Sequence, residues 1–319
     1  MGSSTVRWID VHHHILPARY RQELERLGVA SIGGATIPDW TAKASREMLD
    51  RGGLQAAMLS ISSPGAYSED VATAVELARI CNDELAQAVG SDPGRFGAFA
   101  ALPMPHVEAS LQTLQRCSQF DGVGLIASYG NRYLGDPAFR PVFEELHRRG
   151  AVVFIHPTVG PGSLSFDIDV LPAAVEFTFD TTRAVLSLLR AGVFHNYPDI
   201  KFILAHNGGT IPFLAGRIAS LLERRLPYET FAPLGVSHYL KQLYYECTTS
   251  TSDATLKCVL AFAGSSQILF GTDYPFAPEA VGARGKQDVA AFGDFSEQDR
   301  RLIASGNVAR LLPRFAAPL

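Results

Sequence analysis

The sequence has few features that would direct the protein to a membrane, to nucleic acid or to an oxidising compartment. It contains no run of about 18 apolar residues, so we predict no membrane-spanning helix. Its net charge is −4, and because phosphate binding needs clustered cations, we expect no nucleic-acid partner. Residues 1–5 show no basic patch followed by an apolar stretch, and the four cysteines have no C-x-x-C spacing. These features predict a cytoplasmic protein with reduced thiols.

Several sequence motifs of common enzyme classes are missing as well. No Gly-x-Ser-x-Gly motif is present, and the glycine pairs at Gly122–Gly124 and Gly208–Gly209 complete neither a dinucleotide-binding nor a P-loop fingerprint. We therefore expect neither a serine nucleophile on a sharp turn nor a nucleotide cofactor.

Short apolar runs alternate with helical periodicity along the chain. The runs are Val6–Val11, Ala56–Ile61, Phe96–Ala101, Gly122–Ile126, Ala151–Ile155, Lys201–Ala205, Leu243–Cys247 and Gln267–Phe270. The helical stretches are Val71–Val89, Val107–Cys117, Pro137–Arg149, Thr181–Leu189, Ile211–Arg224, Asp253–Ala261 and Glu297–Ala304. This alternation predicts βαβ units and a parallel sheet that is buried on both faces. Eight strands favour an α/β fold of the (β/α)₈ barrel type, and an open doubly wound sheet is the competing architecture.

Residues that can bind a metal follow four of the eight apolar runs. His12 and His14 follow the first run, His156 the fifth, His206 the sixth and Asp273 the eighth. In a barrel, functional residues come from the carboxyl ends of many different strands. In an open sheet they lie together at one switch point. The sequence therefore predicts one metal site at the C-terminal ends of the barrel strands, held by His12, His14, His156 and Asp273.

The spacing of the first histidines has a geometric meaning. Side chains alternate faces along a strand, so His12 and His14 are expected to point inward together and His13 to point the other way. Asp10 has the parity of His12, which makes it a candidate to fix the tautomer of a histidine ligand. A remnant of a histidine tag is the alternative, but a tag does not follow an apolar strand.

Several stretches carry a family resemblance. Asp10–Pro17, Phe154–Pro157, Leu204–Gly209 and Phe270–Pro275 resemble the amidohydrolase superfamily, in the branch of aminocarboxymuconate-semialdehyde decarboxylase. Within that branch the chain most resembles the 6-methylsalicylate decarboxylases, through Tyr129–Gly130, Tyr133–Pro141, Arg148–Thr158 and Gly208–Phe213.

The resemblance implies one barrel domain over residues 1–319 and one divalent metal. Three histidines and one aspartate suit zinc, and manganese is the alternative if water and substrate add oxygen ligands. The resemblance also implies nonoxidative loss of CO₂ from an ortho-hydroxy aromatic acid and a homodimer. His206 would be the acid or base, and Asp273 would be a ligand that can also move a proton. Arg217 matches an arginine that reaches the neighbouring subunit's site and binds a substrate carboxylate, although a helix-surface arginine is the alternative.

The sequence says less about which residues surround the substrate and which reaction takes place than it does about the metal ligands. Tyr129, Tyr133, Phe177, Phe179 and Phe276 are candidates to contact a planar ring, and Phe177 and Phe179 follow a Pro-containing loop and could line the mouth of the barrel. A hydrolase that attacks an amide, lactone or C–C bond would use the same ligands, because a metal can also activate water. A catalytically silent metal-binding barrel is a third interpretation.

Overall fold

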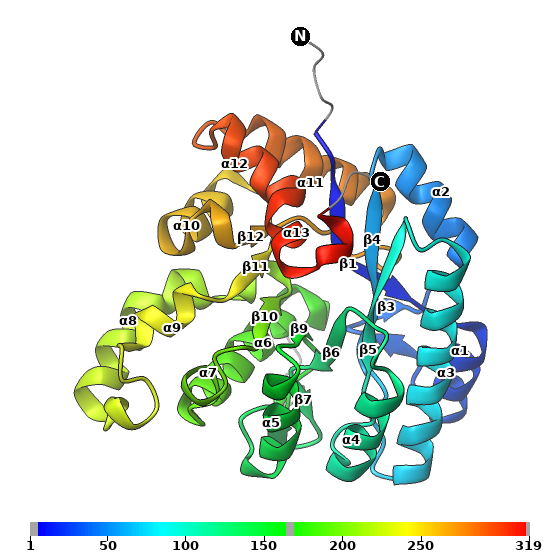
Figure 1. Cartoon of the computed structure of the whole chain (residues 1–319), viewed down its shortest axis with the longest axis horizontal. Coiled ribbons are helices and arrows are strands. Elements are labelled where there is room, and N and C mark those ends of the chain that lie inside the picture. The colour runs from blue at the N-terminus through cyan, green and yellow to red at the C-terminus, as the bar shows by residue number, and fades with distance from the viewer. Residues whose placement is uncertain (1–5, 164–168, 317–319) are drawn as a thin grey trace.

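Eight parallel strands form the centre of the molecule and helices surround them (Figure 1). The computed structural model describes residues 6–163 and 169–316. Neighbouring strands pair in the order β1 (Ile9–Ile15), β4 (Ala56–Ile61), β5 (Phe96–Ala101), β6 (Gly122–Ile126), β9 (Val152–His156), β10 (Lys201–Leu204), β11 (Tyr244–Glu246) and β12 (Ile268–Leu269). The Val11 amide donates to the Phe270 carbonyl at 3.0 Å, which joins the last strand to the first. The barrel is thereby confirmed over the open sheet.

The helices lie outside this barrel and connect its strands. They are α1 (Ala18–Arg26), α2 (Ala42–Gly52), α3 (Val71–Ser91), α4 (Val107–Arg116), α5 (Arg140–Arg148), α6 (Pro172–Arg190), α7 (Val193–Asn196), α8 (Ile211–Arg225), α9 (Val236–Lys241), α10 (Asp253–Ala263), α11 (Glu279–Ala291), α12 (Glu297–Arg301) and α13 (Asn307–Leu311). Two small antiparallel pairs, β2 (Ser31–Ile32) with β3 (Ala35–Thr36) and β7 (Ser128–Tyr129) with β8 (Arg132–Tyr133), lie in the loops. Among the described residues, no helix is both long and apolar enough to cross a lipid bilayer.

The predicted first strand was wrong in its position. The apolar run Val6–Val11 predicted a strand that ends before the histidines, but β1 spans Ile9–Ile15 and includes all three of them. Every residue of β1 is buried, because its polar side chains find partners inside the protein. By contrast, β4, β5 and β6 have the bounds that their apolar runs predict.

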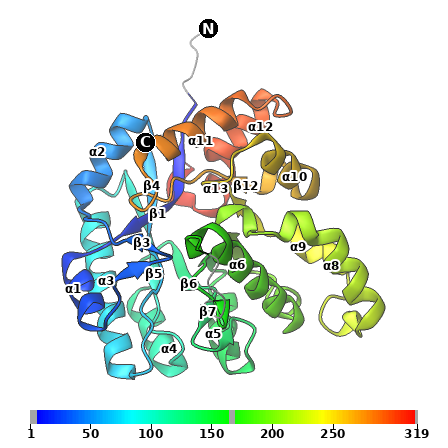
Figure 2. The same ribbon diagram turned by 180° about the vertical axis from the view of Figure 1, so that it is seen from behind.

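The helix after β9 also begins earlier than predicted. Helical periodicity predicted a start at Thr181, whereas α6 begins at Pro172, a residue favoured in the first turn because its missing N–H has no partner there. Phe177 and Phe179 therefore lie within this helix, ahead of the predicted start. Residues two apart on a helix point about 200° apart, so these two rings face opposite sides. In the view from behind, α6 lies in front of the strands (Figure 2).

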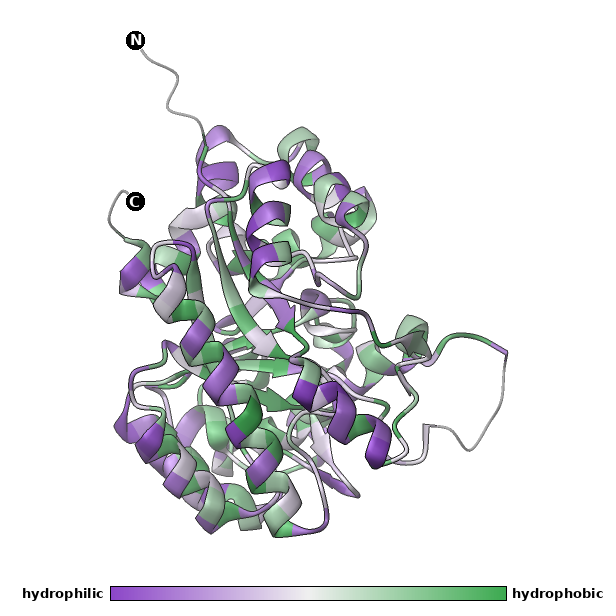
Figure 3. Cartoon of the chain, turned by 90° about the vertical axis from the view of Figure 1, so that its right-hand side faces the viewer, coloured by the Kyte–Doolittle hydropathy of each residue, from purple (hydrophilic) through white to green (hydrophobic). Residues whose placement is uncertain are grey.

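Two hydrophobic clusters hold the layers together. The larger one fills the space between strands and helices, with side chains such as Leu59, Leu188 and Phe202. The smaller one fills the barrel, where Phe99 stacks on Phe154 at a centroid distance of 5.6 Å. The hydropathy colouring shows the green strands inside and much of the purple on the outer helices (Figure 3). Because apolar side chains fill the inside of the barrel, the polar side chains gather at the carboxyl ends of the strands.

Two glycines of β6 offer a test of how closely the strands approach. A Cβ atom on Gly122 would lie 2.4 Å from the Val152 carbonyl oxygen, whereas one on Gly124 would meet nothing closer than 3.7 Å. We expect Gly122→Ala to lower the free energy of unfolding by about 1–3 kcal/mol, the usual effect of overpacking. Gly124→Ala is the matched control and should change it by less than about 1 kcal/mol. Urea unfolding measures both, and equal effects would contradict the close approach of β6 to β9.

Candidate metal centre

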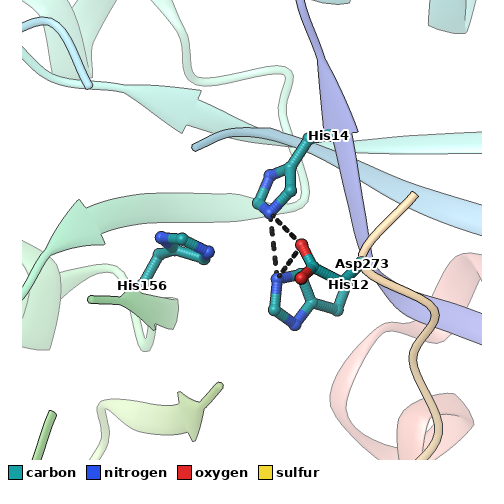
Figure 4. Close-up of side chains that lie close together, drawn as sticks. All are labelled: His12, His14, His156 and Asp273. Atoms are coloured by element: carbon teal, nitrogen blue, oxygen red, sulfur yellow. Dashed lines mark hydrogen bonds and ion pairs between the residues drawn. The ribbon is translucent and has the colours of Figure 1, made fainter. Parts of the chain in front are cut away.

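Four side chains from three different strand ends meet at one point. His12 and His14 lie on β1, His156 ends β9, and Asp273 follows β12. One ligand atom from each lies within 4.8 Å of the others. The Nε2 atoms of His12 and His14 are 2.9 Å apart, and Asp273 Oδ1 lies 3.3 and 3.2 Å from them (Figure 4). The structure thus brings together the four residues that the sequence singled out, and their role as metal ligands remains a prediction.

A β-bulge in β1 decides which histidines face this point. The pairing of β1 with β4 shifts register between Asp10 and His13, so strict alternation is broken there. His13 points away, with Nδ1 2.9 Å from Asp10 Oδ2 and Nε2 2.8 Å from Ser45 Oγ. Asp10 therefore lies on the side of His13, and the expectation that it shares the face of His12 was wrong. Its Oδ2 atom also accepts from Thr272 Oγ1 at 2.6 Å, which ties β1 to the segment before Asp273.

Hydrogen bonds set the tautomers of two of these histidines. His156 Nδ1 lies 2.8 Å from the Pro157 carbonyl oxygen, and His12 Nδ1 lies 2.6 Å from Glu246 Oε2. Carbonyl and carboxylate oxygens accept only, so Nδ1 of each ring must carry a proton, and Nε2 is the nitrogen left to face a metal. This is the arrangement that metal-binding histidines need.

The ionisation of three members of the group, His14, His156 and Asp273, also suits metal binding. Burial lowers the pKa of His14 to about 4 and lowers that of His156 well below its ordinary value, so both are neutral at pH 7. Burial would raise the pKa of Asp273, but the His12 imidazole holds it well below its ordinary value. For His12, burial favours the neutral form, yet the Glu246 and Asp273 carboxylates outweigh it and raise the pKa to about 10, so a metal ion would have to displace a proton from this ring. Three imidazole nitrogens and one carboxylate form a donor set that fits one divalent ion.

His206 lies beside this group without being part of it. Its ring centroid is 5.0 Å from that of His12 and 5.9 Å from that of His156. Its Nδ1 atom lies 3.2 Å from Thr249 Oγ1, which leaves Nε2 as the ring nitrogen available for proton transfer. Burial lowers the pKa of His206. A neutral imidazole next to the group is suited to act as an acid or base, and that role remains a prediction.

Strained backbone gathers at the same place. His206, Asn207, Thr249 and Asp273 all have φ between 53° and 59°, although none of them is glycine. For a β-branched residue such as Thr249 this conformation is a real outlier. Strain of this kind persists where the surrounding structure enforces it, and it clusters at functional sites. It makes the loops after β10, β11 and β12 candidates for a functional site.

A cavity of about 480 Å³ opens onto the group. His156, His206 and Asp273 line its polar part, together with the hydroxyl groups of Ser62 and Thr249. The rest of its wall is mostly apolar, from Ile32, Ala35, Leu171, Ala173, Ala174, Phe177, Phe276, Ala277, Pro278 and Val281. Its volume is in the range of small-molecule sites, and its walls suit a flat apolar ring.

Only some of the predicted substrate contacts lie in this cavity. Phe276 lines it and packs edge-on to His14 at 5.8 Å, and Phe177 lines it from α6. Phe179 is 40% exposed on the opposite side of α6, with the Arg183 guanidinium 5.9 Å from its ring. The helix, which was not expected there, separates the two phenylalanines.

The other three candidates also lie away from the cavity wall formed by the described residues. Tyr129 is buried in the core, where its hydroxyl accepts from the Ile126 amide at 2.9 Å. Tyr133 is half-buried, with the charged groups of Asp180 and Arg183 as neighbours. Arg217 is exposed on α8. None of these three contacts the cavity within this subunit.

Glu246 is a site residue that the sequence interpretation missed. It ends β11, is fully buried and contacts His12 directly. The only signal in the sequence was a single acidic residue inside the apolar run Leu243–Cys247. A charged residue in such a run has to be compensated inside the protein, which makes it a candidate for a functional site.

Comparisons with known proteins find relatives over nearly the whole chain. The profile of a family described as Amidohydrolase matches residues 9–314. A 6-methylsalicylic acid decarboxylase of Penicillium expansum is 34% identical over 317 residues, covering 96% of each chain. A 2-amino-3-carboxymuconate-6-semialdehyde decarboxylase of Dictyostelium discoideum is 29% identical, covering 95% of this chain and 91% of the relative.

A solved structure has the same fold. The crystal structure of a dihydroxybenzoic acid decarboxylase from Polaromonas sp. JS666, with bound manganese and the inhibitor 2-nitroresorcinol, superposes with a TM-score of 0.82. It is 24% identical, and the alignment covers 96% of each chain. At 24% identity, the similarity to this structure supports only the barrel fold.

Replacing Asp273 by Asn tests the four-residue group. Asn adopts a positive φ about as readily as Asp does, so the backbone at φ 59° should be kept while the anionic ligand is lost. We expect Asp273→Asn to retain its circular dichroism spectrum and to lose most of its bound metal and its activity. Elemental analysis of the purified protein measures the metal content. Wild-type metal content together with the wild-type rate would remove Asp273 from the site.

Proposed function

Because the chain belongs to the amidohydrolase family, we propose that it is a metal-dependent decarboxylase of ortho-hydroxybenzoic acids such as 6-methylsalicylate. Its relatives are named as decarboxylases of 6-methylsalicylic acid, of γ-resorcylate and of 2,6-dihydroxybenzoate. The chain is therefore a carboxy-lyase that acts on hydroxyaromatic acids. The particular acid is the finer part of the proposal, and the relative from Penicillium expansum supports a methyl-substituted ring.

One observation carries this proposal: the four-residue group opens directly into an apolar cavity of the size of a substituted ring. His156 and Asp273 belong to the group and also line the cavity, so a molecule in the cavity touches the group. A planar acid would place its carboxylate and its neighbouring hydroxyl at the polar end, with its ring between Phe177 and Phe276. The apolar wall would also exclude water from the reacting carbon.

The chemistry requires a proton before the carboxyl group can leave. Direct loss of CO₂ from an aromatic carbon would leave an unstable aryl anion. If that carbon first accepts a proton, a C–H bond forms and the ring loses its aromaticity. The C–C bond then breaks, its electron pair restores the aromatic ring, and CO₂ leaves. The site must therefore hold the acid in place and deliver one proton to the carbon.

Two residues of the chain are placed to do this. His206 faces the cavity and has its Nδ1 atom against Thr249, so we assign proton delivery to its Nε2 atom. Asp273 is the second proton carrier to consider, because it lies in the cavity wall as well as in the ligand group. A metal bound by the group would supply a Lewis acid that orients the hydroxyl and carboxylate oxygens of the substrate.

We propose zinc as the metal, with manganese as the alternative. Three imidazoles and one carboxylate are a common zinc set, which supports zinc. Manganese is compatible with additional oxygen ligands, and the Polaromonas structure carries it. Elemental analysis of protein purified without added metal decides between them.

We propose a homodimer in which Arg217 serves the site of the neighbouring subunit. Arg217 is exposed on α8, one turn from Phe213, whose side chain is 81% exposed. A large exposed phenylalanine next to an arginine is a composition typical of interface centres. The planar guanidinium could then bind a substrate carboxylate through two hydrogen bonds.

We also propose a cytoplasmic location. All four cysteines lie in the described part of the chain and are free thiols. Burial raises the pKa of Cys81 and Cys247, which keeps these thiols protonated and unreactive. Thiols kept in this form are typical of proteins in a reducing compartment.

A panel of substrates tests the reaction. Metal-loaded enzyme should release CO₂ from 6-methylsalicylate and other ortho-hydroxybenzoates, because both the hydroxyl and the carboxylate are needed at the polar end of the cavity. Benzoates without the ortho-hydroxyl group are the control and should react at least about 100-fold more slowly. CO₂ release and product formation are measured together. Turnover confined to a parallel panel of amides and lactones would identify a hydrolase instead.

Mixed dimers test Arg217. Arg217→Ala subunits should be poorly active on their own, and Asp273→Asn subunits inactive. Heterodimers of the two should recover about half the wild-type rate if the arginine acts across the interface, since one intact metal group then meets one intact arginine. Arg225→Ala, an exposed arginine at the end of the same helix, is the control and should behave as wild type. Heterodimers no more active than the Arg217→Ala subunits would place Arg217 in its own subunit's site. Wild-type activity of Arg217→Ala on its own would place it outside both sites.

A further inference from the structure

Glu246 is the only charged residue of β11, and it lies inside the barrel with no solvent exposure. An unpaired carboxylate at such a position would be strongly unfavourable, so its partners explain why it is there. Its contacts are all with the segments that form the candidate metal centre.

The two oxygens of this carboxylate accept hydrogen bonds from three segments of the chain. Oε2 accepts from His12 Nδ1 at 2.6 Å and from the backbone N–H of His206 at 3.3 Å. Oε1 accepts from the backbone N–H of Thr248. One side chain thereby joins β1 to the loop after β10 and to the turn after β11.

The segment after β12 closes on the same carboxylate. A Cβ atom on Gly271 would lie 2.3 Å from Glu246 Oε1 and 2.7 Å from the Cβ atom of His12. Only glycine fits at this point, and the carboxylate cannot move toward β12. Its position is therefore enforced by its neighbours.

We propose that Glu246 is a positioning residue that holds both the predicted metal ligand His12 and the predicted proton carrier His206 in their working orientations. This inference rests on the metal-dependent function proposed above. It gives one buried carboxylate a role in metal binding and in proton delivery at the same time.

The action on His12 follows from the tautomer. Both oxygens of the carboxylate act as acceptors, so the proton of the His12 ring is held on Nδ1. Nε2 then faces His14 Nε2 and Asp273 Oδ1, which lie 2.9 and 3.3 Å away, and it is the nitrogen left to bind a metal once its own proton is lost. Without the carboxylate, the other tautomer would place a proton at the point where the ligands converge.

The action on His206 is through its backbone. His206 has φ 53°, a conformation that is uncommon outside glycine, and the bond from its N–H to Glu246 holds that conformation. Its ring is held separately through Thr249. Loss of the backbone bond should let the ring shift relative to the cavity.

Two other roles for Glu246 have to be distinguished from positioning. His12, His206 and Glu246 also form a group that could itself hold a metal ion, which would make Glu246 a ligand of a second ion. Alternatively, the carboxylate only fills and stabilises the barrel. The three roles predict different results for the same variant.

Glu246→Gln is the central variant, because it keeps the size and removes the second acceptor. An amide has one acceptor oxygen, so it cannot serve both His12 Nδ1 and the Thr248 N–H. Zn²⁺ and Mn²⁺ are titrated separately into metal-free full-length protein in competition with a chelator of known affinity. Four further measurements are made on wild type and variant. They are the metal bound per chain, the unfolding of the metal-free protein, kcat and KM at saturating metal, and the histidine tautomers from ¹⁵N–¹H correlation spectra.

We expect the variant to bind one metal per chain, as wild type does, with an affinity about 10–100-fold lower. At saturating metal, kcat should fall with KM nearly unchanged, and the Nδ1–H tautomer of His12 should lose its dominance. Glu223→Gln is the matched control, since Glu223 accepts from the Val236 N–H at 2.8 Å far from the site. It should leave metal affinity, kcat and the histidine spectra unchanged.

Each other result has a definite meaning. A fall from two bound metals to one would make Glu246 a ligand and overturn the proposal. Lower stability with unchanged metal affinity, tautomers and kcat would leave it a purely structural role. If wild type itself binds no metal at the site, the proposed function fails, whatever the variant does. Should the glutamine variant not fold, Glu246→Asp keeps the charge but shortens the reach, and wild-type metal affinity and kcat in it would overturn the proposal.

Discussion

Three backbone hydrogen bonds join β1 to the end of β12 and the segment after it, and the candidate metal centre depends on them. The Val11 amide donates to Phe270 at 3.0 Å, the Asp273 amide to His12 at 2.8 Å, and the His14 amide to Tyr274 at 2.7 Å. They close the barrel and at the same time bring the carboxylate of Asp273 to two imidazoles that lie about 260 positions earlier in the chain. The positive φ of Asp273 follows from this closure, because its side chain has to turn inward while its amide bonds to β1.

Two buried carboxylates hold the histidines of β1, one from the strand itself and one from β11. Asp10 bonds to His13 and Thr272 on the outer side, and Glu246 bonds to His12 on the inner side. Buried charges of this kind are tolerated because each has several hydrogen-bond partners, and removing one partner would leave the other uncompensated. The result is a strand whose His12 and His13 rings are each held by a buried carboxylate. Preorganisation of this kind is what a metal centre and its proton carrier require.

The cavity has a polar end next to the four-residue group and a mostly apolar wall. No lysine or arginine is among the described residues that line it, so within one subunit a substrate carboxylate would depend on the predicted metal for a positive charge. The apolar wall makes the cavity suited to an acid with a hydrophobic ring. An arginine from a second subunit would then add the specificity that a single metal ion lacks, which is the place that the dimer proposal gives to Arg217.

The amino-acid sequence by itself determined the alternation of buried strands with helices and the metal-type residues at four strand ends, because both depend on local periodicity. It predicted that His12 and His14 share a face, and the structure agrees. It could not reveal the bulge that places Asp10 beside His13, since alternation assumes a regular strand. Nor could it pair Glu246 with His12, 234 positions away, because only the closed barrel brings β11 and β1 together. Local patterns report which way a side chain faces within its own strand or helix, and tertiary closure alone decides what it meets there.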